Sequence, residues 1–313
     1  MRFKKPKFWD YKKPNIYSYL LWPISILIKL ISLFKIIIIK KKSFSIKTIC
    51  IGNIYLGGTG KTSLSLKINK ILNEKKIKTC FIKKFYPDQI DEQSILENDG
   101  KLFKNKSRLK SLLQADLEGY KVAIFDDGLQ DNSINYDLRI VCFNNTNWIG
   151  NGFTIPSGPL RENVENIKKY KNVFLNGNDE DLYKIKEFIS KIDSNINIYQ
   201  GRYIPKNIKD FDVNDKFLVF SGIGNHKTFI SMLKNNKLNI VKDIEFPDHY
   251  SYSKNDINNI ISISNKLNCK IITTEKDYAR FKKNDFNNIK YIKVDLEILN
   301  EKKFLEDISR LYE

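Results

Sequence analysis

From Ser45 onward, short apolar runs alternate along the chain with stretches typical of helices. Apolar runs bounded by polar or turn residues predict β-strands, here over 46–51, 78–82, 122–125, 138–143, 172–175, 217–221, 271–274 and 291–294. The intervening stretches predict helices over 61–72, 181–192, 227–233 and 301–311. Strands that alternate with helices usually form a largely parallel sheet covered by helices, so the pattern predicts an α/β fold.

A polar, strand-poor segment at 204–214 interrupts this alternation after Tyr203 and is typical of a linker. We therefore expect two α/β domains, a first one over 45–203 and a smaller second one over 215–313. Residues 1–44 precede both as a separate N-terminal segment with a different pattern.

The N-terminal segment contains an almost wholly apolar stretch at 16–39, interrupted by Lys29 and Lys35 and flanked by lysines on both sides. At about 100° per residue, a helix over this stretch has most of its surface apolar. Its polar positions fall on one narrow stripe, formed by Ser18, Ser25, Lys29 and Ser32.

Three interpretations of this stretch compete: a cleaved signal peptide, a spanning helix and an interfacial helix. No small-residue cleavage site follows it, since the run continues into three lysines at 40–42, which argues against a signal peptide. The thin polar stripe, the basic flanks and the rings of Tyr19 and Trp22 suit a helix at the headgroup boundary. A length of about 24 residues also suffices to span a bilayer of roughly 30 Å. We predict that residues 1–44 anchor the chain to a membrane, with spanning left open.

The net charge of the chain is strongly positive, with 54 Lys and Arg against 36 Asp and Glu, a formal charge of +18. Such a charge attracts nucleic acid, anionic lipid or phosphorylated substrates. The excess is nearly all lysine scattered along the chain, without an arginine-rich or aromatic-interleaved stripe, so we expect no nucleic acid partner. The four cysteines are far apart and form no CxxC pair, which argues against a zinc site and a disulfide framework.

A glycine-rich loop, Gly-Asn-Ile-Tyr-Leu-Gly-Gly-Thr-Gly-Lys-Thr at 52–62, joins the first predicted strand to the first predicted helix. In this context glycines let backbone N–H groups surround phosphate oxygens, and the helix N-terminus adds favourable partial charge. Lys61 would reach the β- and γ-phosphates during transfer, and Thr62 would ligate Mg²⁺. The strict motif has glycine where this chain has Tyr55. We predict that ATP binds the residues Gly57, Gly58, Thr59, Gly60, Lys61 and Thr62.

An acidic turn follows the predicted strand at 122–125 and delivers Asp126 and Asp127 to the carboxyl end of that strand. This is where a nucleotide-binding fold places a partner for Mg²⁺. One aspartate can hold the metal, directly or through water, while the other orients it. We predict that Thr62, Asp126 and Asp127 form the metal site.

These two motifs alone leave several functions open. A P-loop kinase or NTPase that acts on another small or lipid-like substrate would account for both of them. So would a membrane-bound P-loop switch ATPase of the partition or assembly kind. Such a switch needs nucleotide-dependent dimerisation but no general base on a second domain.

Further motifs follow in a fixed order: Gly-Asn-Gly at 150–152, Pro-Ser-Gly-Pro-Leu-Arg-Glu at 156–162, Phe-Pro-Asp-His-Tyr at 246–250 and Thr-Thr-Glu-Lys-Asp at 273–277. Together with the phosphate loop and the Asp-Asp-Gly-Leu-Gln turn, they resemble the tetraacyldisaccharide 4′-kinase family over nearly the whole chain. The resemblance implies transfer of the ATP γ-phosphate, with Mg²⁺, to the 4′-hydroxyl of a tetraacylated glucosamine disaccharide 1-phosphate. The product of that reaction is lipid IVA, in lipid A biosynthesis.

The resemblance also implies an architecture and a location. The family combines a P-loop domain and a second α/β domain, with the active site in the cleft between them, and it carries an N-terminal membrane helix. Its members act at the cytoplasmic face of the inner membrane, where the partners are the acylated disaccharide lipid and the membrane surface. The resemblance names no protein partner.

Matched residue by residue, Asp91, which Glu92 follows, corresponds to the catalytic carboxylate of the family, and His249 to its catalytic histidine. A sugar hydroxyl is a poor nucleophile until a carboxylate accepts its proton, and an imidazole can orient that carboxylate. Arg161 and Glu162 are expected to line the substrate cleft or to support it as an ion pair.

The chain departs from the family pattern near the second predicted strand and after the acidic turn. Lys-Phe-Tyr at 84–86 stands where the family has Arg-Gly-Tyr, and Ile90 where it has the glycine before the catalytic carboxylate. Asp131 stands where the family usually has a histidine. The shape of the loop that leads to Asp91 therefore differs from the usual one.

Overall fold

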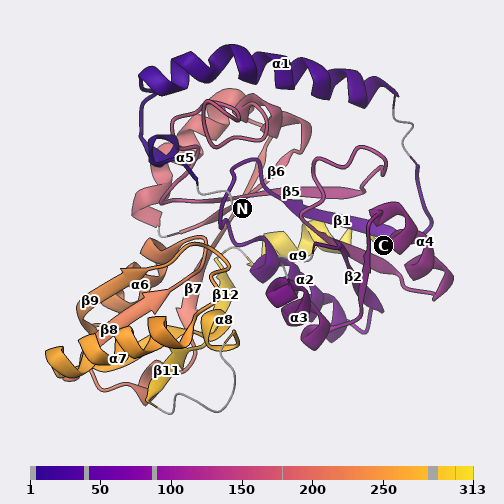
Figure 1. The fold of residues 1–313 in the computed structure, drawn as a ribbon. Coiled ribbons are helices and arrows are strands. Elements are labelled where there is room, and N and C mark those ends of the chain that lie inside the picture. Colours follow the sequence, from indigo (N-terminus) through magenta and orange to yellow (C-terminus); the bar gives the residue numbers. More distant parts are fainter. Residues whose placement is uncertain are drawn as a thin grey trace. The chain divides into compact units, whose positions relative to one another are not determined.

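The chain forms two compact units, which Figure 1 shows in the colours of the sequence. This computed structural model describes residues 5–38, 42–86, 90–177, 179–280, 288–299 and 301–312, without the side chains at 35–38, 90, 91 and 179–181. Unit 1 comprises Met1–Pro87, Glu92–Arg202 and Ile298–Glu313, and unit 2 comprises Asp88–Asp91 and Tyr203–Glu297.

Unit 1 contains most of an eight-stranded sheet in the order β12-β7-β6-β5-β1-β4-β2-β3, of which the end of β7 and all of β12 except Ile298 are assigned to unit 2. The neighbouring strands from β7 to β3 are all parallel. The strands are β1 (Lys47–Gly52), β2 (Thr79–Lys84), β3 (Leu102–Asn105), β4 (Val122–Asp126), β5 (Leu138–Asn144), β6 (Asn172–Asn176), β7 (Asn197–Pro205) and β12 (Val294–Ile298). The central strands are buried on both faces, which explains their continuous apolar runs.

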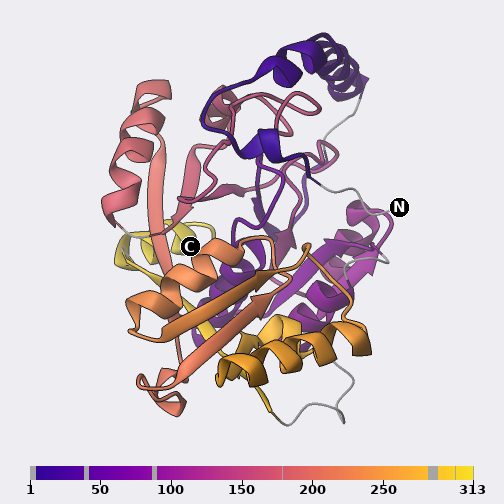
Figure 2. The same cartoon turned by 60° about the vertical axis from the view of Figure 1, so that its left-hand side comes forward.

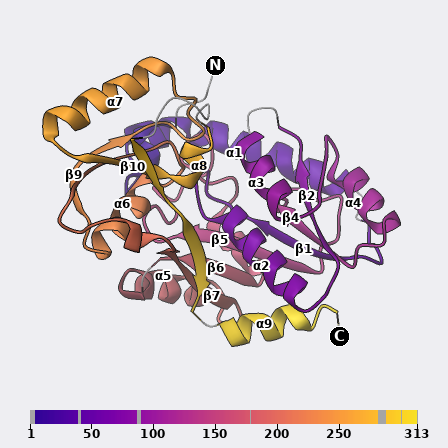
Figure 3. The same ribbon diagram turned by 90° about the horizontal axis from the view of Figure 1, so that it is seen from below.

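Helices cover both faces of this sheet. Alternate residues such as Cys50, Phe125 and Val141 face one core, which α4 (Arg108–Leu117) and α5 (Asp179–Ile192) close. On the other face, the rings of Phe174 and Tyr199 contact the ring of Phe304 from α9. Figure 3 shows α9 beside α2. The helices of this face are α2 (Lys61–Glu74) and α9 (Glu301–Ser309), and α3 (Ile90–Asp99) precedes β3 in the chain.

The N-terminal part of unit 1 consists of a 3₁₀ helix, η1 (Lys7–Asp10), and the long helix α1 (Ile16–Ile38). Ser18 and Ser25 of the predicted polar stripe are buried at 0% and 3% exposure, whereas Leu20 and Phe34 on the apolar surface are 68% and 67% exposed. The helix therefore turns Ser18 and Ser25 toward the protein, while Ser32 and most of the apolar surface are exposed. By length and composition α1 could cross a membrane, which for one helix is weak evidence.

Unit 2 is a smaller sheet in the order β11-β10-β8-β9 with parallel neighbours. Phe217 and Val219 of β8 pack with α6, while Leu218 and Phe220 pack with α7, so alternate residues face the two helices. Figure 2 shows these helices on opposite faces of the sheet. The elements are β8 (Lys216–Ser221), α6 (His226–Asn235), β9 (Asn239–Glu245), α7 (Lys254–Leu267), β10 (Lys270–Thr274), α8 (Glu275–Tyr278) and β11 (Ile289–Ile292).

The predicted α/β fold, with a large parallel sheet and an N-terminal apolar helix, is confirmed. Two local predictions were wrong. The strand predicted at 291–294 is the junction of β11 and β12, and β7 extends into the start of the segment predicted as a linker. The domain boundaries at 45–203 and 215–313 stay predictions; the compact units differ from them in grouping Ile298–Glu313 with unit 1, where α9 packs on the large sheet.

Candidate active site

The phosphate loop lies between the carboxyl end of β1 and the start of α2, as predicted. Gly60 has a φ of 86° and caps α2, which begins with Lys61. A left-handed residue at this point directs the chain from the loop into the helix, and glycine adopts it without a Cβ clash. The side-chain amide of Asn144 at the end of β5 donates to the carbonyl of Gly58 and so fixes the loop to the sheet. The N-terminus of α2 therefore presents N–H groups and Lys61 at the carboxyl edge of the sheet, where a phosphate group is favoured.

The Pro-Ser-Gly-Pro-Leu-Arg-Glu segment at 156–162 lies against the phosphate loop. The backbone N of Leu56 donates to the carbonyl of Pro159 at 2.8 Å, and the backbone N of Arg161 donates to the carbonyl of Ile54 at 2.6 Å. These bonds flank an antiparallel bridge between Tyr55 and Leu160. The segment at 156–162 is thus an added strand-like support that fixes the first half of the loop.

Tyr55, which replaces the glycine of the strict motif, is a structural residue. Its side chain is fully buried, and its hydroxyl donates to Asp10 Oδ1 of η1 at 2.6 Å. Burial and the neighbouring carboxylate of Asp10 raise the pKa of the Tyr55 hydroxyl above its ordinary value. The tyrosine at this position therefore connects the phosphate loop to the N-terminal segment through its bond to Asp10.

Asp126 lies at the end of β4, fully buried and next to the phosphate loop. The hydroxyl of Thr62 donates to Asp126 Oδ2 at 3.2 Å, and Lys83 Nζ donates to the same oxygen at 2.6 Å. Among the described residues, Asp126 Oδ1 is buried and has no hydrogen-bond partner. A buried carboxylate oxygen without a partner is costly, so Oδ1 is the atom that a bound cation or its water would satisfy.

Lys83 was not predicted as a site residue, yet its ammonium lies between the carboxylates of Asp126 and Glu92. Lys83 Nζ is 2.6 Å from Asp126 Oδ2 and 2.7 Å from Glu92 Oε2, and the lysine side chain is only 3% exposed. Burial alone would lower the pKa of Lys83, but the carboxylates of Asp126 and Glu92 outweigh it and raise that pKa above its ordinary value. The only sequence signal was a lysine at the end of an apolar strand, which is common on protein surfaces.

Asp127 takes a different role from Asp126. Its φ is 63°, and its carboxylate receives both Nη atoms of Arg161, at 2.9 Å to Oδ1 and 3.2 Å to Oδ2. Burial would raise the pKa of Asp127, but the charges of Lys61 and Arg161 hold it below the ordinary value. Arg108 donates to the backbone carbonyl of Asp127 and so supports the left-handed turn. Asp127 is therefore an ionised partner of Arg161 at the edge of the loop.

Glu162, predicted beside Arg161, is held by residues that follow its segment and by the acidic turn. Its carboxylate accepts hydrogen bonds from Tyr170 at 2.7 Å, Asn166 at 2.9 Å and Gln130 at 3.2 Å. Gln130 also accepts from Arg161 Nη1 at 3.0 Å. Arg161 thus pairs with Asp127, and Gln130 joins Arg161 and Glu162 into one network beside the phosphate loop.

The donor set at this edge fits Mg²⁺. The hydroxyl of Thr62 and the free oxygen of Asp126 are hard oxygen ligands, and Mg²⁺ is usually held by one or two carboxylates together with substrate phosphates. Within the described ranges, no group of three or more acidic, histidine or cysteine side chains could hold a metal by itself. The arrangement therefore fits a metal that the nucleotide helps to bind. Asp127, the third predicted ligand, has both carboxylate oxygens engaged by Arg161.

The predicted catalytic pair is described only in part. Asp91 lies in the first turn of α3, and its side chain is outside the described residues. His249 belongs to unit 2, where its φ is 58° and its backbone N donates to the carbonyl of Gly222 at 3.1 Å. Its ring is partly exposed, at 21%, with Nε2 3.8 Å from Asp248 Oδ2. Asp91 and His249 as a catalytic pair stay a prediction.

The Thr-Thr-Glu-Lys-Asp motif at 273–277 organises the carboxyl edge of the unit 2 sheet. Thr274 caps α8 by accepting from the backbone N of Asp277. Asp277 is fully buried and accepts from the backbone N of Gly222 at 3.1 Å, from Tyr252 at 3.0 Å and from Arg280 at 2.8 Å. The motif therefore fixes the loop after β8, to which His249 is hydrogen-bonded.

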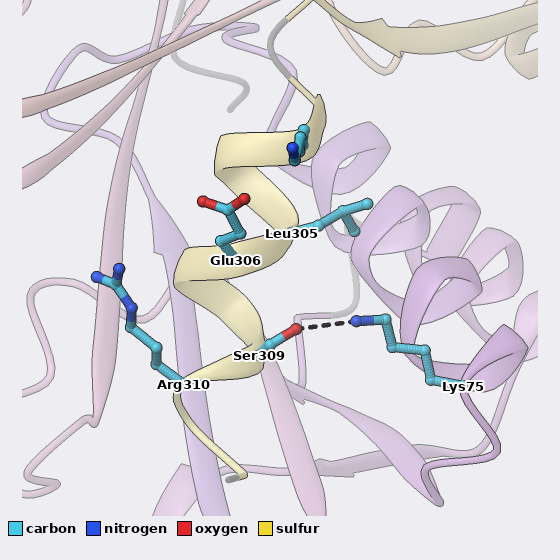
Figure 4. A pocket seen from close by; sticks show the side chains of 6 residues that line it. Lys75, Leu305, Glu306, Ser309 and Arg310 are labelled. Carbon is cyan, nitrogen blue, oxygen red and sulfur yellow. Dashed lines mark hydrogen bonds between the residues drawn. The ribbon is translucent and has the colours of Figure 1, made fainter.

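A separate surface pocket lies at the other end of α2, away from the phosphate loop. In Figure 4, Lys75 reaches across it and donates to Ser309 of α9 at 2.9 Å. A helix of this length is about 20 Å long, so the pocket is not part of the candidate active site. It is lined by Lys75, Lys302, Leu305, Glu306, Ser309 and Arg310.

Comparison with known proteins identifies the family. The family model for tetraacyldisaccharide-1-P 4′-kinase, LpxK, matches residues 17–106 and 91–313. The tetraacyldisaccharide 4′-kinase of Pelagibacter ubique (strain HTCC1062) is 59% identical over 316 residues, which cover 100% of this chain and 99% of that protein. The enzyme of that name from Rickettsia typhi (strain ATCC VR-144 / Wilmington) is 33% identical over 323 residues, covering 96% and 97%.

A solved structure shows the same fold. LpxK from Aquifex aeolicus, in complex with ATP, superposes with a TM-score of 0.70 at 21% sequence identity, covering 95% of this chain and 100% of that one. At this identity the superposition supports the fold, while the family model and the full-length relatives support membership. The chain belongs to the tetraacyldisaccharide 4′-kinase family.

Proposed function

We propose that the residues at the carboxyl edge of β1, β2 and β4 carry out the reaction of this family. That reaction transfers the γ-phosphate of ATP to the 4′-hydroxyl of tetraacyldisaccharide 1-phosphate and forms lipid IVA. The observation that carries the proposal is the phosphate loop of Lys61 and Thr62 directly opposite the buried carboxylate of Asp126. A P-loop switch ATPase would use the same loop, but it would not account for membership in this family.

The loop residues Gly57, Gly58, Thr59, Gly60, Lys61 and Thr62 bind the phosphates of ATP in this proposal. Backbone N–H groups at the start of α2 donate to phosphate oxygens, and the Lys61 ammonium lies along the β- and γ-phosphates. Arg161 is fixed by Asp127 with its guanidinium beside the loop, where it can stabilise charge on the transferred group. Because these groups are fixed before substrate binds, they stabilise developing charge without reorganising.

The hydroxyl of Thr62 and the carboxylate of Asp126 would hold Mg²⁺, since Asp126 Oδ1 has no hydrogen-bond partner among the described residues. When bound, Mg²⁺ neutralises charge on the transferred phosphoryl group. The hydroxyl of Thr62 donates a hydrogen bond to Asp126 Oδ2, which leaves a lone pair of the hydroxyl oxygen available to a cation. The two residues therefore present adjacent oxygens on one side of the loop.

The proton of the 4′-hydroxyl passes to Asp91, with His249 orienting that carboxylate. This assignment is supported by the family motifs and by the place of Asp91 in the first turn of α3, directly before Glu92, which Lys83 holds. A positioned base contributes about 10²–10⁴-fold to the rate. We therefore expect Asp91→Asn and His249→Ala to lose transfer by at least about 10²-fold while they still bind ATP.

Transfer from γ-labelled ATP to purified tetraacyldisaccharide 1-phosphate in detergent micelles tests the proposal. The controls are Lys70→Ala on the exposed side of α2 for Lys61→Ala, and Asp99→Asn in α3 for Asp91→Asn. Labelled lipid from the wild type and both controls, and little from the two site variants, is the expected result. If Asp91→Asn turns over like Asp99→Asn, the base assignment is wrong and the rest of the proposal stands.

The chain also works at a membrane in this proposal, with α1 as its anchor and the inner membrane, cytoplasmic face, as its location. Between Ile16 and Phe34 the apolar surface of α1 is exposed, while Ser25 bonds to Thr154 and Ser157. Figure 1 shows the helix lying along one side of unit 1. An apolar surface of this kind, flanked by lysines, fits insertion into the lipid boundary. The acylated substrate would then be reached from the bilayer.

Flotation with anionic phospholipid vesicles tests the anchor. We expect the double variant Leu20→Glu and Phe34→Glu, and a chain lacking residues 1–42, to stay at the bottom of the gradient. Leu117→Glu, which changes an exposed leucine on α4, is the matched control and should float with the wild type. Flotation of the chain without residues 1–42 would place the anchor elsewhere.

A further inference from the structure

Lys83 is a buried cation that the motifs of the family do not assign, and the sheet explains why it lies in the site. β2 and β4 are parallel neighbours, with Ile82 opposite Phe125, so Lys83 and Asp126 come side by side at the carboxyl edge. The Lys83 side chain is 3% exposed and that of Asp126 is fully buried. A lysine in this position cannot turn to solvent, and its ammonium has to be satisfied inside the site.

Lys83 contacts two carboxylates, that of the candidate metal ligand Asp126 and that of Glu92. Its Nζ donates to Asp126 Oδ2 at 2.6 Å and to Glu92 Oε2 at 2.7 Å. Thr62 donates to the same Asp126 oxygen at 3.2 Å, so Oδ2 is fully engaged and only Oδ1 remains. Lys83 and Thr62 therefore leave Oδ1 as the oxygen of Asp126 that is open to a cation.

The charges of the group balance without a metal. Three carboxylates lie with three cations in this group: Lys83 pairs with both Asp126 and Glu92, and Arg161 pairs with Asp127. The charge of Lys61 also acts on Asp127 and lowers its pKa. A buried carboxylate without a cation is strongly destabilising, and Lys83 is that cation for Asp126. A divalent ion added to this balanced group is repelled by the nearby ammonium, whereas the phosphates of ATP supply the negative charge that the ion requires.

We infer that Lys83 is a positioning residue that makes Mg²⁺ binding depend on ATP. It supplies positive charge to Asp126 and Glu92 while the nucleotide is absent, so the metal binds together with ATP and not before it. Once ATP is present, Lys83 keeps Asp126 Oδ2 engaged, so Oδ1 would be the oxygen available to the metal or its water, and it holds the carboxylate of Glu92. The inference rests on the proposed function of the loop as an ATP site.

Metal binding to the nucleotide-free protein tests this role without any transfer reaction. Mn²⁺ serves as the probe, because it prefers the oxygen ligands that Mg²⁺ takes. The electron paramagnetic resonance signal of the free aqua ion measures unbound Mn²⁺, and its decrease on adding protein gives the bound amount. Changes beside a metal ligand alter metal affinity about 10–100-fold. Because the group removed here is a cation, we expect Lys83→Met to bind Mn²⁺ at least about tenfold tighter than the wild type.

Two variants separate charge from structure. Lys83→Arg keeps the cation and should bind Mn²⁺ as weakly as the wild type. Lys104→Met is the matched control, because Lys104 lies opposite Lys83 in the register of β3 and β2 but forms an exposed pair with Glu97. It should leave Mn²⁺ binding unchanged.

Equal or weaker Mn²⁺ binding by Lys83→Met than by the wild type overturns the inference. If Lys83→Met does not fold, the wild type decides, since tight Mn²⁺ binding by the nucleotide-free wild type overturns it as well. Failure of the proposed function looks different, because it appears as absent phosphate transfer in the wild type with Mg²⁺ and ATP, whatever the metal affinity of the free protein.

Discussion

Replacing Ser25 with alanine should loosen the contact through which α1 is fixed to the segment beside the phosphate loop. Ser25 is 3% exposed, and its hydroxyl donates to the carbonyl of Thr154 at 3.0 Å. It also lies 2.8 Å from Ser157 Oγ and accepts from the backbone N of Ser157 at 3.2 Å. Alanine removes all three interactions and leaves buried groups of the 154–157 segment without partners.

The size of the effect follows from those buried groups. Leaving a buried donor or acceptor unsatisfied costs about 1–3 kcal/mol, and each 1.4 kcal/mol is a factor of ten in an equilibrium. The local opening equilibrium of α1 from the segment should therefore increase roughly 5- to 150-fold. The apolar surface of α1 is unchanged, so its membrane contact should persist.

Hydrogen exchange of the full chain in detergent micelles measures this opening, because the amide of Ser157 donates directly to Ser25. We expect peptides that contain Ser157 to lose protection by the factor above in Ser25→Ala. Ser32→Ala is the matched control, since Ser32 lies on the same predicted stripe but is exposed. Unchanged protection in Ser25→Ala, or an equal loss in Ser32→Ala, would refute the reasoning.

Three further predictions concern the loop and the thiols. Arg161→Lys should lower kcat/KM for transfer about 10- to 100-fold, because lysine cannot form the bidentate pair with Asp127. A variant as active as the wild type would contradict this. Tyr55→Ala should lower the free energy of unfolding in urea by about 3–5 kcal/mol, because a fully buried ring is lost; a loss below 1 kcal/mol would show that the ring is not a packing element. A thiol reagent at pH 8 should label one cysteine of the native chain, the half-buried Cys269. Burial protects the other three and raises the pKa of Cys80 to about 12. The native Cys269→Ser variant should therefore take up no label, and labelling of it would contradict this.

The sheets could be predicted where their strands are buried on both faces. Strands such as β1 and β4 are continuous apolar runs because helices cover both sides of them. β9 was not predicted, since it is an edge strand whose residues are mostly exposed and polar. β7 was missed for a related reason: only Tyr199, Gln200 and Gly201 are buried, and the strand then alternates between exposed and half-buried positions.

The candidate site could be predicted where its residues are contiguous in sequence. Lys61 and Thr62 follow a glycine-rich loop after β1, and Asp126 ends β4. Parallel strands bring their carboxyl ends to one edge of the sheet. The role of Lys83 could not be predicted, because its contact with Asp126 depends on β2 and β4 being neighbours in the sheet order. Strand order is a tertiary property that no local pattern encodes.

The departures from the family motifs are explained in part by tertiary contacts. Tyr55 fills the space beside Gly57, where an added Cβ would lie 2.8 Å from the tyrosine ring, and it bonds to Asp10 in the N-terminal segment. Asp131 lies 3.5 Å from Arg108, which also supports the turn at Asp127. Both contacts join residues far apart in the chain, so the sequence pattern gave no sign of them.

The central claim is that this chain transfers phosphate from its Lys61 loop to one defined hydroxyl. The most direct measurement incubates wild type and Lys61→Ala with ATP, Mg²⁺ and tetraacyldisaccharide 1-phosphate and then locates the new phosphate by ³¹P and proton magnetic resonance of the lipid product. We predict one added phosphate, on the 4′-oxygen, from the wild type and a loss of at least about 10²-fold in Lys61→Ala. A phosphate on another hydroxyl, no lipid product from a wild-type protein that binds ATP, or full activity of Lys61→Ala would contradict the claim.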